Sequence, residues 1–311
     1  MHFSIKVNDD LFPVIILKDE LQKTEAVIYA FGAVLNSFII DGKQNIIDGF
    51  SSVKDATKNI TNGFKSAKLS PFVCRVRKGE YAFDEKKYKT GKFFLGEEAI
   101  HGLLYDAVYT ITGSSADNNS AFVKLEYRYT KKDEGFPFEY LCEIIYQLEK
   151  NNTLTITTTV TNKSDTGMPL CDGWHPYFDF SQPVNNLLFT INADKVLGFD
   201  NKLLPTGKIF SFNRFQSAEK LNDTFFDNCF ILKNTNQRAC IIEDEKHKLR
   251  FAISPSEDYP YLQVYTPPHR NSIAIENLSA APDAFNNKIG LLILNPLETK
   301  TFTTVFQAEF Y

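Results

Sequence analysis

The sequence lacks the features that mark several large classes of protein. Its five cysteines are odd in number, widely spaced and without any C-x-x-C pair: Cys74, Cys142, Cys171, Cys229 and Cys240. This spacing argues against a disulfide framework and against a thiolate metal site, so we expect reduced and mostly buried thiols. Helical periodicity is almost absent, and no G-x-G-x-x-G or Walker-type loop occurs. A βαβ sheet with a nucleotide-binding crevice is therefore disfavoured.

An excess of positive charge and a long apolar run are also missing. The formal net charge of -4 and the pI near 5.8 argue against a nucleic acid or an anionic membrane as partner. No segment reaches the roughly 18 apolar residues of a membrane helix, and nothing resembles a secretory signal after "MHFSIKVNDD". We therefore expect a cytoplasmic protein with a small ligand that is not polyanionic. The sequence does not indicate an oligomeric state.

Short β-type runs are what the sequence has in abundance. In "TLTITTTVTN", residues 153–162, Leu154, Ile156 and Val160 alternate with threonines, which is typical of a half-buried strand. The preceding run "FEYLCEIIYQL" is rich in β-branched and aromatic residues, and "EKNN" between the two runs is a turn. The pair therefore predicts an antiparallel hairpin. The stretch "DGFSSVKDATKN", residues 48–59, is one of a few short and weak candidates for a helix.

The length permits either one large β-domain or two smaller domains. Strand-like runs continue from one end of the chain to the other, without a long Pro/Gly/Ser linker and without a repeat of fixed period. We therefore predict an all-β fold, one large antiparallel sandwich over residues 1–311. The 28 phenylalanines would fill the core between its sheets.

The stretch "CDGWHPYFDF", residues 171–180, places a histidine among aromatic residues. Pro176 disfavours a helical conformation for His175, so we expect an extended and well-defined backbone there. Trp174, Tyr177 and Phe178 offer flat apolar faces that suit either a packed core or a site for a partly apolar ligand, such as the C–H face of a sugar. The aromatic residues alone do not choose between a buried structural histidine and a functional one.

A second stretch, "NSIAIENLSAAPDAFN", carries a carboxylate at the end of a predicted strand. Ile273 and Ile275 alternate with Glu276, so the glutamate points away from the face that buries the isoleucines. Small residues follow and leave room for a ligand. The alternative is an exposed glutamate at the rim of a sheet.

Five segments together resemble the aldose 1-epimerases, also called galactose mutarotases. "GWHPYF" is similar to the HPYF motif of that family, and "IAIENLSAAPDAFN" is similar to its catalytic-glutamate strand and the loop that follows. "PFVCRVRKGEYAF" places Arg75 at the family's arginine, although Cys74 stands where asparagine is usual. "AIHGLLYD" places His101 at the first histidine, and "FFDNCFIL" places Asp227 at an acidic position. The segments follow the family order from about residue 25 to the last strand. The resemblance implies a large antiparallel β-supersandwich.

The resemblance also implies the interconversion of the α and β anomers of a free aldohexose. His175 would be the general acid toward the ring oxygen and Glu276 the general base toward the C1 hydroxyl. From unperturbed pKa values we expect an imidazolium and a carboxylate at neutral pH, each stabilised by the other. His101, Arg75 and Asp227 would bind sugar hydroxyls or the ring oxygen. The partner is a small monosaccharide, and the resemblance implies no metal and no other cofactor.

Several site assignments have competitors in the sequence. Arg77 is predicted to share a strand face with Arg75, Asp223 competes with Asp227, and His101 could serve only the turn at Gly102. Three further aromatic or polar residues could line the pocket or belong to the core; these are Trp174, Gln263 and Tyr265.

Three rival functions stay open at this point. A hexose-6-phosphate 1-epimerase would need two or more converging cations, and the cluster of Arg75, Arg77 and Lys78 does not show that they converge. A noncatalytic sugar-binding protein would not need both His175 and Glu276. A glycoside hydrolase on a related sandwich would use two carboxylates and would leave the histidine without a role.

Overall fold

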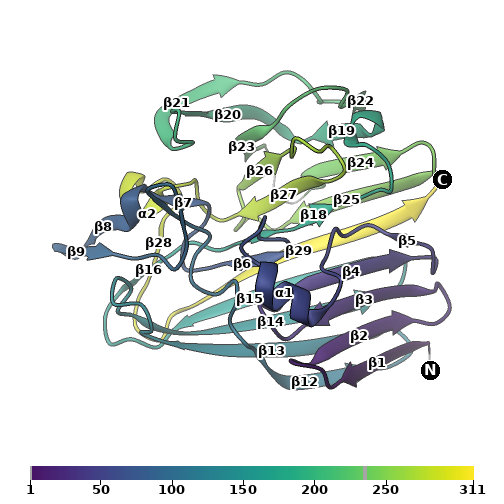
Figure 1. The fold of residues 1–311 in the computed structure, drawn as a ribbon, viewed down its shortest axis with the longest axis horizontal. Helices are drawn as coiled ribbons and strands as arrows, with labels where there is room; N and C mark the ends of the chain where they lie inside the picture. The colour runs from purple at the N-terminus through teal and green to yellow at the C-terminus, as the bar shows by residue number, and fades with distance from the viewer. Residues whose placement is uncertain (1, 234–236) are drawn as a thin grey trace.

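A computed structural model describes residues 2–233 and 237–311 and consists mainly of β-strands (Figure 1). Each strand pair in these residues for which a register is assigned is antiparallel, and the strands form two large sheets with several smaller ones. The predicted fold class, a large antiparallel β-sandwich, is confirmed. The few helices are short: α1 (Val53–Asn59), α2 (Ala284–Asn287) and the 3-10 turns Arg77–Gly79 and Val184–Asn186.

The larger sheet has nine strands, and the hairpin predicted around "EKNN" lies within it. In pairing order the strands are β12 (Thr110–Ala116), β13 (Ser120–Thr130), β14 (Glu139–Glu149), β15 (Thr153–Asn162), β29 (Thr299–Phe310), β25 (Leu249–Pro255), β24 (Cys240–Asp244), β19 (Leu188–Ile191) and β22 (Glu219–Lys220). Leu154, Ile156 and Val160 are buried along β15, as the period-two pattern predicts. The threonines on its other face pair with threonines of β29, for example Thr159 with Thr301 at 3.2 Å.

The second sheet has eight strands and carries most of the candidate site. In pairing order they are β21 (Pro205–Ser211), β20 (Ala193–Phe199), β23 (Asp227–Leu232), β26 (Tyr261–Tyr265), β27 (Ile273–Leu278), β17 (Gly173–His175) and β6 (Ala67–Leu69), and β18 (Tyr177–Phe178) also pairs with β27. Phe178 packs against Phe251 of β25 and Phe306 of β29, with ring centroids 4.9 and 5.6 Å apart. Aromatic side chains therefore join the two sheets, as expected from the phenylalanine content.

The smaller sheets complete the structure. The N-terminal meander, purple in Figure 1, contains β1 (Phe3–Asn8), β2 (Val14–Asp19), β3 (Thr24–Tyr29), β4 (Leu35–Ile40) and β5 (Gln44–Asn45). The others pair β7 (Arg75–Val76), β11 (Glu98–Ile100) and β10 (Phe94–Leu95), then β8 (Glu80–Phe83) with β9 (Lys86–Lys89), and β16 (Met168–Leu170) with β28 (Leu292–Leu294). Helix α1 falls within the weakly helical stretch 48–59, and its first turn is capped by the Ser52 hydroxyl.

A fully buried ion pair lies beside the strand that carries His175. Lys68 Nζ of β6 donates to Asp172 Oδ1 at 2.5 Å and to the carbonyl of Gly173 at 3.2 Å, and neither charged side chain is exposed. The Tyr259 hydroxyl donates to the same carboxylate oxygen at 2.6 Å, and the ammonium lies 4.6 Å from the Trp174 ring centre. Burial raises the pKa of Asp172, while Lys68 and Tyr259 oppose the rise. The ion pair therefore joins β6 to Asp172, the residue immediately before β17.

Within the described ranges, the structure has no helix with the length and apolar character needed to span a membrane.

Candidate active site

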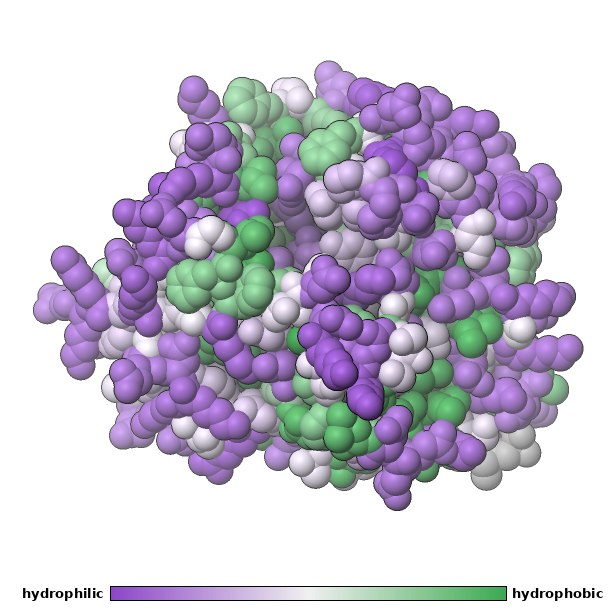
Figure 2. Space-filling view, in the orientation of Figure 1, coloured by the Kyte–Doolittle hydropathy of each residue, from purple (hydrophilic) through white to green (hydrophobic). Residues whose placement is uncertain are grey.

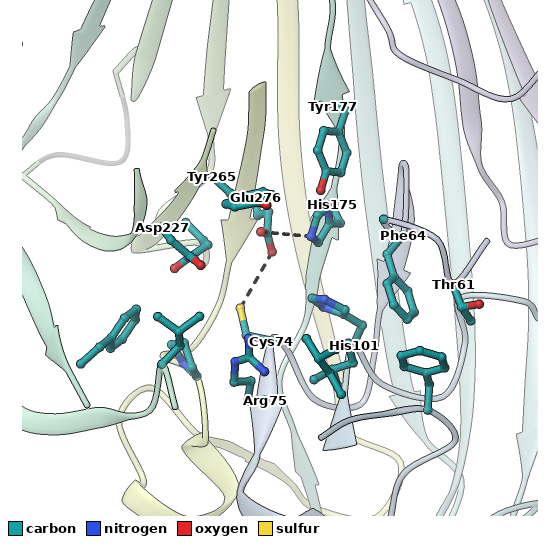
Figure 3. A pocket seen from close by; sticks show the side chains of 18 residues that line it. Thr61, Phe64, Cys74, Arg75, His101, His175, Tyr177, Asp227, Tyr265 and Glu276 are labelled. Atoms are coloured by element: carbon teal, nitrogen blue, oxygen red, sulfur yellow. Dashed lines mark hydrogen bonds and ion pairs between the residues drawn. The ribbon is translucent and has the colours of Figure 1, made fainter. Parts of the chain in front are cut away.

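A cavity of about 350 Å³ opens beside the eight-stranded sheet, and Figure 2 shows a hollow on this face. Its polar lining includes the five residues predicted from the sequence and one glutamine: Arg75, His101, His175, Asp227, Gln263 and Glu276. Its apolar walls include Phe64, Phe93, Leu95, Phe199 and Leu203. Figure 3 shows the side chains of the five predicted residues around the same space. The structure therefore brings all five predicted site residues together.

His175 and Glu276 meet on neighbouring strands. His175 ends β17, and Glu276 lies in the middle of β27, whose Leu278 pairs with Gly173. Ile273 and Ile275 are buried, and strand alternation turns Glu276 to the opposite face, as the sequence predicts. His175 Nε2 lies 3.2 Å from Glu276 Oε1 (Figure 3), and the two side chains are only 7% and 3% exposed.

Asp227 lies on the far side of Glu276. It is the first residue of β23, and Gln263 of β26 stands between β23 and β27 in the sheet. Gln263 Nε2 donates to Asp227 Oδ1 at 2.8 Å, and Gln263 pairs in register with Glu276. Four adjacent strands, β23, β26, β27 and β17, therefore present the aspartate, the amide, the glutamate and the histidine in order.

His101 reaches the site from a tight turn. Its backbone has φ of +62°, its N–H donates to the Cys74 carbonyl at 2.8 Å, and Gly102 follows with φ of +74°. A Cβ on Gly102 would lie 2.4 Å from the Ser70 carbonyl oxygen, so the turn requires glycine. The His101 ring packs against His175, with ring centroids 4.8 Å apart and planes nearly perpendicular. Burial holds the pKa of His101 well below its usual value.

Arg75 lines the cavity as expected, but its competitor Arg77 does not lie where the sequence placed it. Arg75 begins β7 and lines the cavity, whereas Arg77 is not on the same strand face, because the strand ends at Val76 and a 3-10 turn follows. Arg77 is exposed and pairs with Asp200 and Asp283 at 3.6 and 3.9 Å. The expectation that Arg75 and Arg77 share a face was therefore wrong.

The other ambiguous residues divide between pocket and core. Gln263 and Tyr265 line the cavity, whereas Trp174 is buried and its indole N–H donates to Thr158 at 3.3 Å. Asp223 accepts a hydrogen bond from the Asn185 side chain and does not line the cavity. Tyr177 also lines the site, with its ring stacked 5.1 Å from the His175 ring. Its position in "GWHPYF", two residues after His175, is the sequence feature that could have indicated this.

The electrostatics of His175 and Glu276 run against one expectation. Burial raises the pKa of Glu276 well above its usual value, and the negative charge of Asp227 adds to the rise, while Cys74 and Arg75 oppose it. Burial also lowers the pKa of His175 to about 4. Desolvation therefore opposes the imidazolium and the carboxylate that the unperturbed pKa values predict.

Three polar groups of the cavity offer atoms of the kind that bind metals. One ligand atom from each of His101, His175 and Glu276 lies within 4.8 Å of the others, and the described residues contain no other such group. His175 Nε2 and Glu276 Oε1 face each other directly at 3.2 Å, so we identify no metal ligands among the three.

Comparison with known proteins identifies the family. The family model for aldose 1-epimerase matches residues 13–307. The chain belongs to the aldose 1-epimerase family. The Escherichia coli protein YihR is 26% identical over 234 residues, which cover 73% of each chain. The aldose 1-epimerase of Streptococcus thermophilus is 26% identical over 193 residues, 57% of this chain and 52% of that protein.

Solved structures of this family have the same fold. A galactose mutarotase-like protein from Clostridium acetobutylicum superposes with a TM-score of 0.89 at 22% identity, over 100% of this chain and 99% of that one. The galactose 1-epimerase of Lactobacillus acidophilus superposes with a TM-score of 0.83 at 21% identity, over 99% of both chains. The large antiparallel β-sandwich is therefore the galactose mutarotase-like fold.

Proposed function

We propose that this member of the aldose 1-epimerase family is a mutarotase that interconverts the α and β anomers of a free aldohexose. The observation that carries the proposal is the His175–Glu276 pair, 3.2 Å apart and almost fully buried at the polar end of a cavity. Anomer exchange needs one group that gives a proton and one that takes a proton at the same carbon. Adjacent strands hold these two groups in a fixed relation.

Ring opening requires two proton transfers at the C1–O5 edge of the sugar. Glu276 takes the proton of the C1 hydroxyl, and His175 gives its Nε2 proton to the ring oxygen. The C1–O5 bond breaks with its electron pair going to O5, and C1 becomes an aldehyde. Rotation about C1–C2 presents the other face of the carbonyl, and the reverse transfers close the ring. Both groups then regain their starting protons, so no net proton, electron or cofactor is consumed.

The two pKa shifts fit this reaction once the sugar is bound. Burial disfavours the charged form of both groups. In the complex, the C1–O5 edge takes the place of the direct hydrogen bond between Glu276 and His175. The sugar hydroxyls then supply the hydrogen bonds that a carboxylate needs. These bonds stabilise the carboxylate and the imidazolium that the opening step uses.

Three further side chains would orient the sugar. Arg75 is the donor and Asp227 the acceptor for sugar hydroxyls, and His101 bonds the ring oxygen or a neighbouring hydroxyl. Burial raises the pKa of Asp227, and both Arg75 and the Gln263 amide oppose the rise. Such fixed partners reduce the entropy cost of reaching the reactive geometry. The aromatic walls would contact the C–H faces of the ring.

The charge of the cavity favours a free sugar over a sugar phosphate. Among the residues found to line it, Arg75 is the only arginine or lysine. Arg77 pairs with two aspartates outside, and Lys78 is exposed. A phosphate would call for two or more converging cations. The single guanidinium supports an uncharged aldose.

Polarimetry tests the proposal. Freshly dissolved α-D-galactose and α-D-glucose are followed with the parent protein and with the Glu276→Gln and His175→Asn variants, and the 6-phosphates are run in parallel. We expect the parent to speed the change of optical rotation on a free sugar and both variants to lose at least about 100-fold in rate. A rate on the 6-phosphate alone would replace the proposal by a hexose-6-phosphate 1-epimerase. Tight sugar binding without turnover would replace it by sugar binding.

A further inference from the structure

Cys74 occupies a position at the edge of the cavity that its backbone and its neighbours constrain. It lies immediately before β7 with φ of +48°, a left-handed conformation that disfavours β-branched side chains. Its carbonyl accepts the N–H of His101, and its side chain is buried and lines the cavity. Its Sγ lies 3.8 Å from Glu276 Oε2, as Figure 3 shows. One residue therefore contacts the general base and also fixes the turn of a sugar-binding histidine.

The two oxygens of Glu276 have different partners. Oε1 faces His175 Nε2, and Oε2 faces the Cys74 thiol. A thiol is a weak hydrogen-bond donor, weaker than a hydroxyl or an amide. Burial and the nearby Glu276 carboxylate raise the pKa of Cys74 well above its usual value, so the sulfur keeps its proton and stays a donor. The carboxylate is thus held in place with little stabilisation of its charge.

We propose that Cys74 is a positioning residue for Glu276, which orients the carboxylate through a weak S–H donor and leaves it a stronger base than a hydroxyl donor would. This inference rests on the proposed function, because it takes Glu276 as the general base. Cys74 stands where asparagine is usual in the family, and the weaker donor is the chemical effect of that difference.

The thiol is one of several groups that surround Glu276. The groups that face it are His175 from β17, Tyr177 from β18, Asp227 and Cys229 from β23, Gln263 from β26, Cys74 and Arg75 from the β7 edge, and His101 from the turn after β11. Cys74 and Arg75 are the groups among them that lower the pKa of Glu276, and Asp227 raises it. A change of donor strength at residue 74 therefore acts on the carboxyl group without changing the number of charges around it.

The direction of the effect follows from the strength of the donor at residue 74. A stronger donor stabilises the Glu276 carboxylate, so the pKa of the carboxyl group falls, and removal of the donor makes it rise. The kcat/KM profile reports the free enzyme, and one of its two limbs follows this carboxyl group. That limb moves to lower pH for a stronger donor and to higher pH without a donor, whether it is the acidic or the basic limb.

The test compares Cys74→Ser, whose hydroxyl is a stronger donor when the Glu276 carboxyl group closes the 3.8 Å gap to hydrogen-bond distance, with Cys74→Ala, which supplies none. The kcat/KM for mutarotation of galactose is measured from about pH 5 to about pH 9. We expect one limb to shift by about half a pH unit or more, downward for serine and upward for alanine. Cys240→Ser is the matched control: it is the same substitution at a buried thiol of β24, and its profile should superpose on the parent profile.

Two outcomes would overturn the inference. Both variants could shift the limb in the same direction, or neither could shift it beyond the error of the fit while the control behaves as expected. A purely structural role would lower the rate without opposite shifts.

An inactive parent protein would defeat the proposed function but not this test. In that case, the melting temperature of each residue-74 variant is compared with that of the same variant carrying Glu276→Gln, across the same pH range. The pH at which this difference in melting temperature changes reports the titration of the Glu276 carboxyl group. We expect that pH to be lower for Cys74→Ser and higher for Cys74→Ala. Their absence there would refute the inference.

Discussion

Replacement of Lys68 by methionine removes one half of the ion pair buried beside β17. Methionine keeps most of the length of the side chain, but Asp172 then remains in the interior with only the Tyr259 hydroxyl as a donor to its Oδ1. Loss of one partner of a fully buried pair costs ~3–5 kcal/mol of unfolding free energy, because an uncompensated charge is left in the interior. The entropy of unfolding of a chain of 311 residues converts this loss into a fall of about 5–8 °C in melting temperature.

The pH dependence of the loss identifies its cause. Without Lys68, the pKa of Asp172 should rise further above its unfolded value, because burial already raises it and the ammonium opposes that rise. The protonated form is then the stable one in the folded protein, so the variant loses stability as pH increases through that raised pKa. The deficit of Lys68→Met should therefore be small at low pH and larger at neutral pH.

Thermal unfolding followed by circular dichroism checks this prediction. The double variant Lys68→Met/Asp172→Asn, which removes both charges and keeps the shapes, should recover most of the loss at neutral pH. The reasoning is refuted if the single variant melts within about 1 °C of the parent, or if the double variant loses the sum of the two single losses. A deficit that does not change with pH would show that lost packing, and not the uncompensated charge, is responsible.

Two more predictions concern the cavity. Glu276→Gln should raise the melting temperature while it abolishes mutarotation. Because burial raises the pKa of Glu276, the folded parent loses stability as pH rises through that pKa. The gain in melting temperature of the variant over the parent should therefore grow with pH. Thermal melts from about pH 5 to about pH 9 check this, and a gain that falls with pH would contradict it. Arg75→Met should raise the KM for galactose by about 10- to 100-fold because a charged donor to a sugar hydroxyl is lost, whereas the exposed Arg77→Met should change KM less than about twofold. Steady-state kinetics of the two arginine variants test this prediction, and equal changes in KM would refute the assignment of Arg75 to the sugar site.

Much of the fold was predictable because strand alternation is a local property. The burial of Leu154, Ile156 and Val160 follows from a period of two, and the same period turns Glu276 away from its buried neighbours. The proline after His175 was a local signal as well. The family resemblance supplied the remaining site residues, which no spacing rule would have joined, because they come from strands far apart in the chain.

Other features depended on contacts that local patterns do not report. Arg77 lies outside the strand of Arg75 because β7 ends at Val76 and a 3-10 turn begins at Arg77, and Lys78 within this turn has φ of +55°, which its residue type does not indicate. No local pattern indicates that Lys68 is buried, because the partner that makes its burial possible, Asp172, lies 104 positions later. The opposed pKa shifts of the acid/base pair depend on the depth of burial, which a sequence does not fix.

Part of the cavity wall does not belong to the sheet that carries His175 and Glu276. These two residues stand on neighbouring strands, β17 and β27. Two of the apolar wall residues come instead from connecting segments: Phe93 lies in the turn before β10, and Leu203 lies in the turn between β20 and β21. Insertions and exchanges in such turns leave a sheet intact. On the proposed function, changes in these two turns would therefore alter which sugar is accepted, while His175 and Glu276 keep their places.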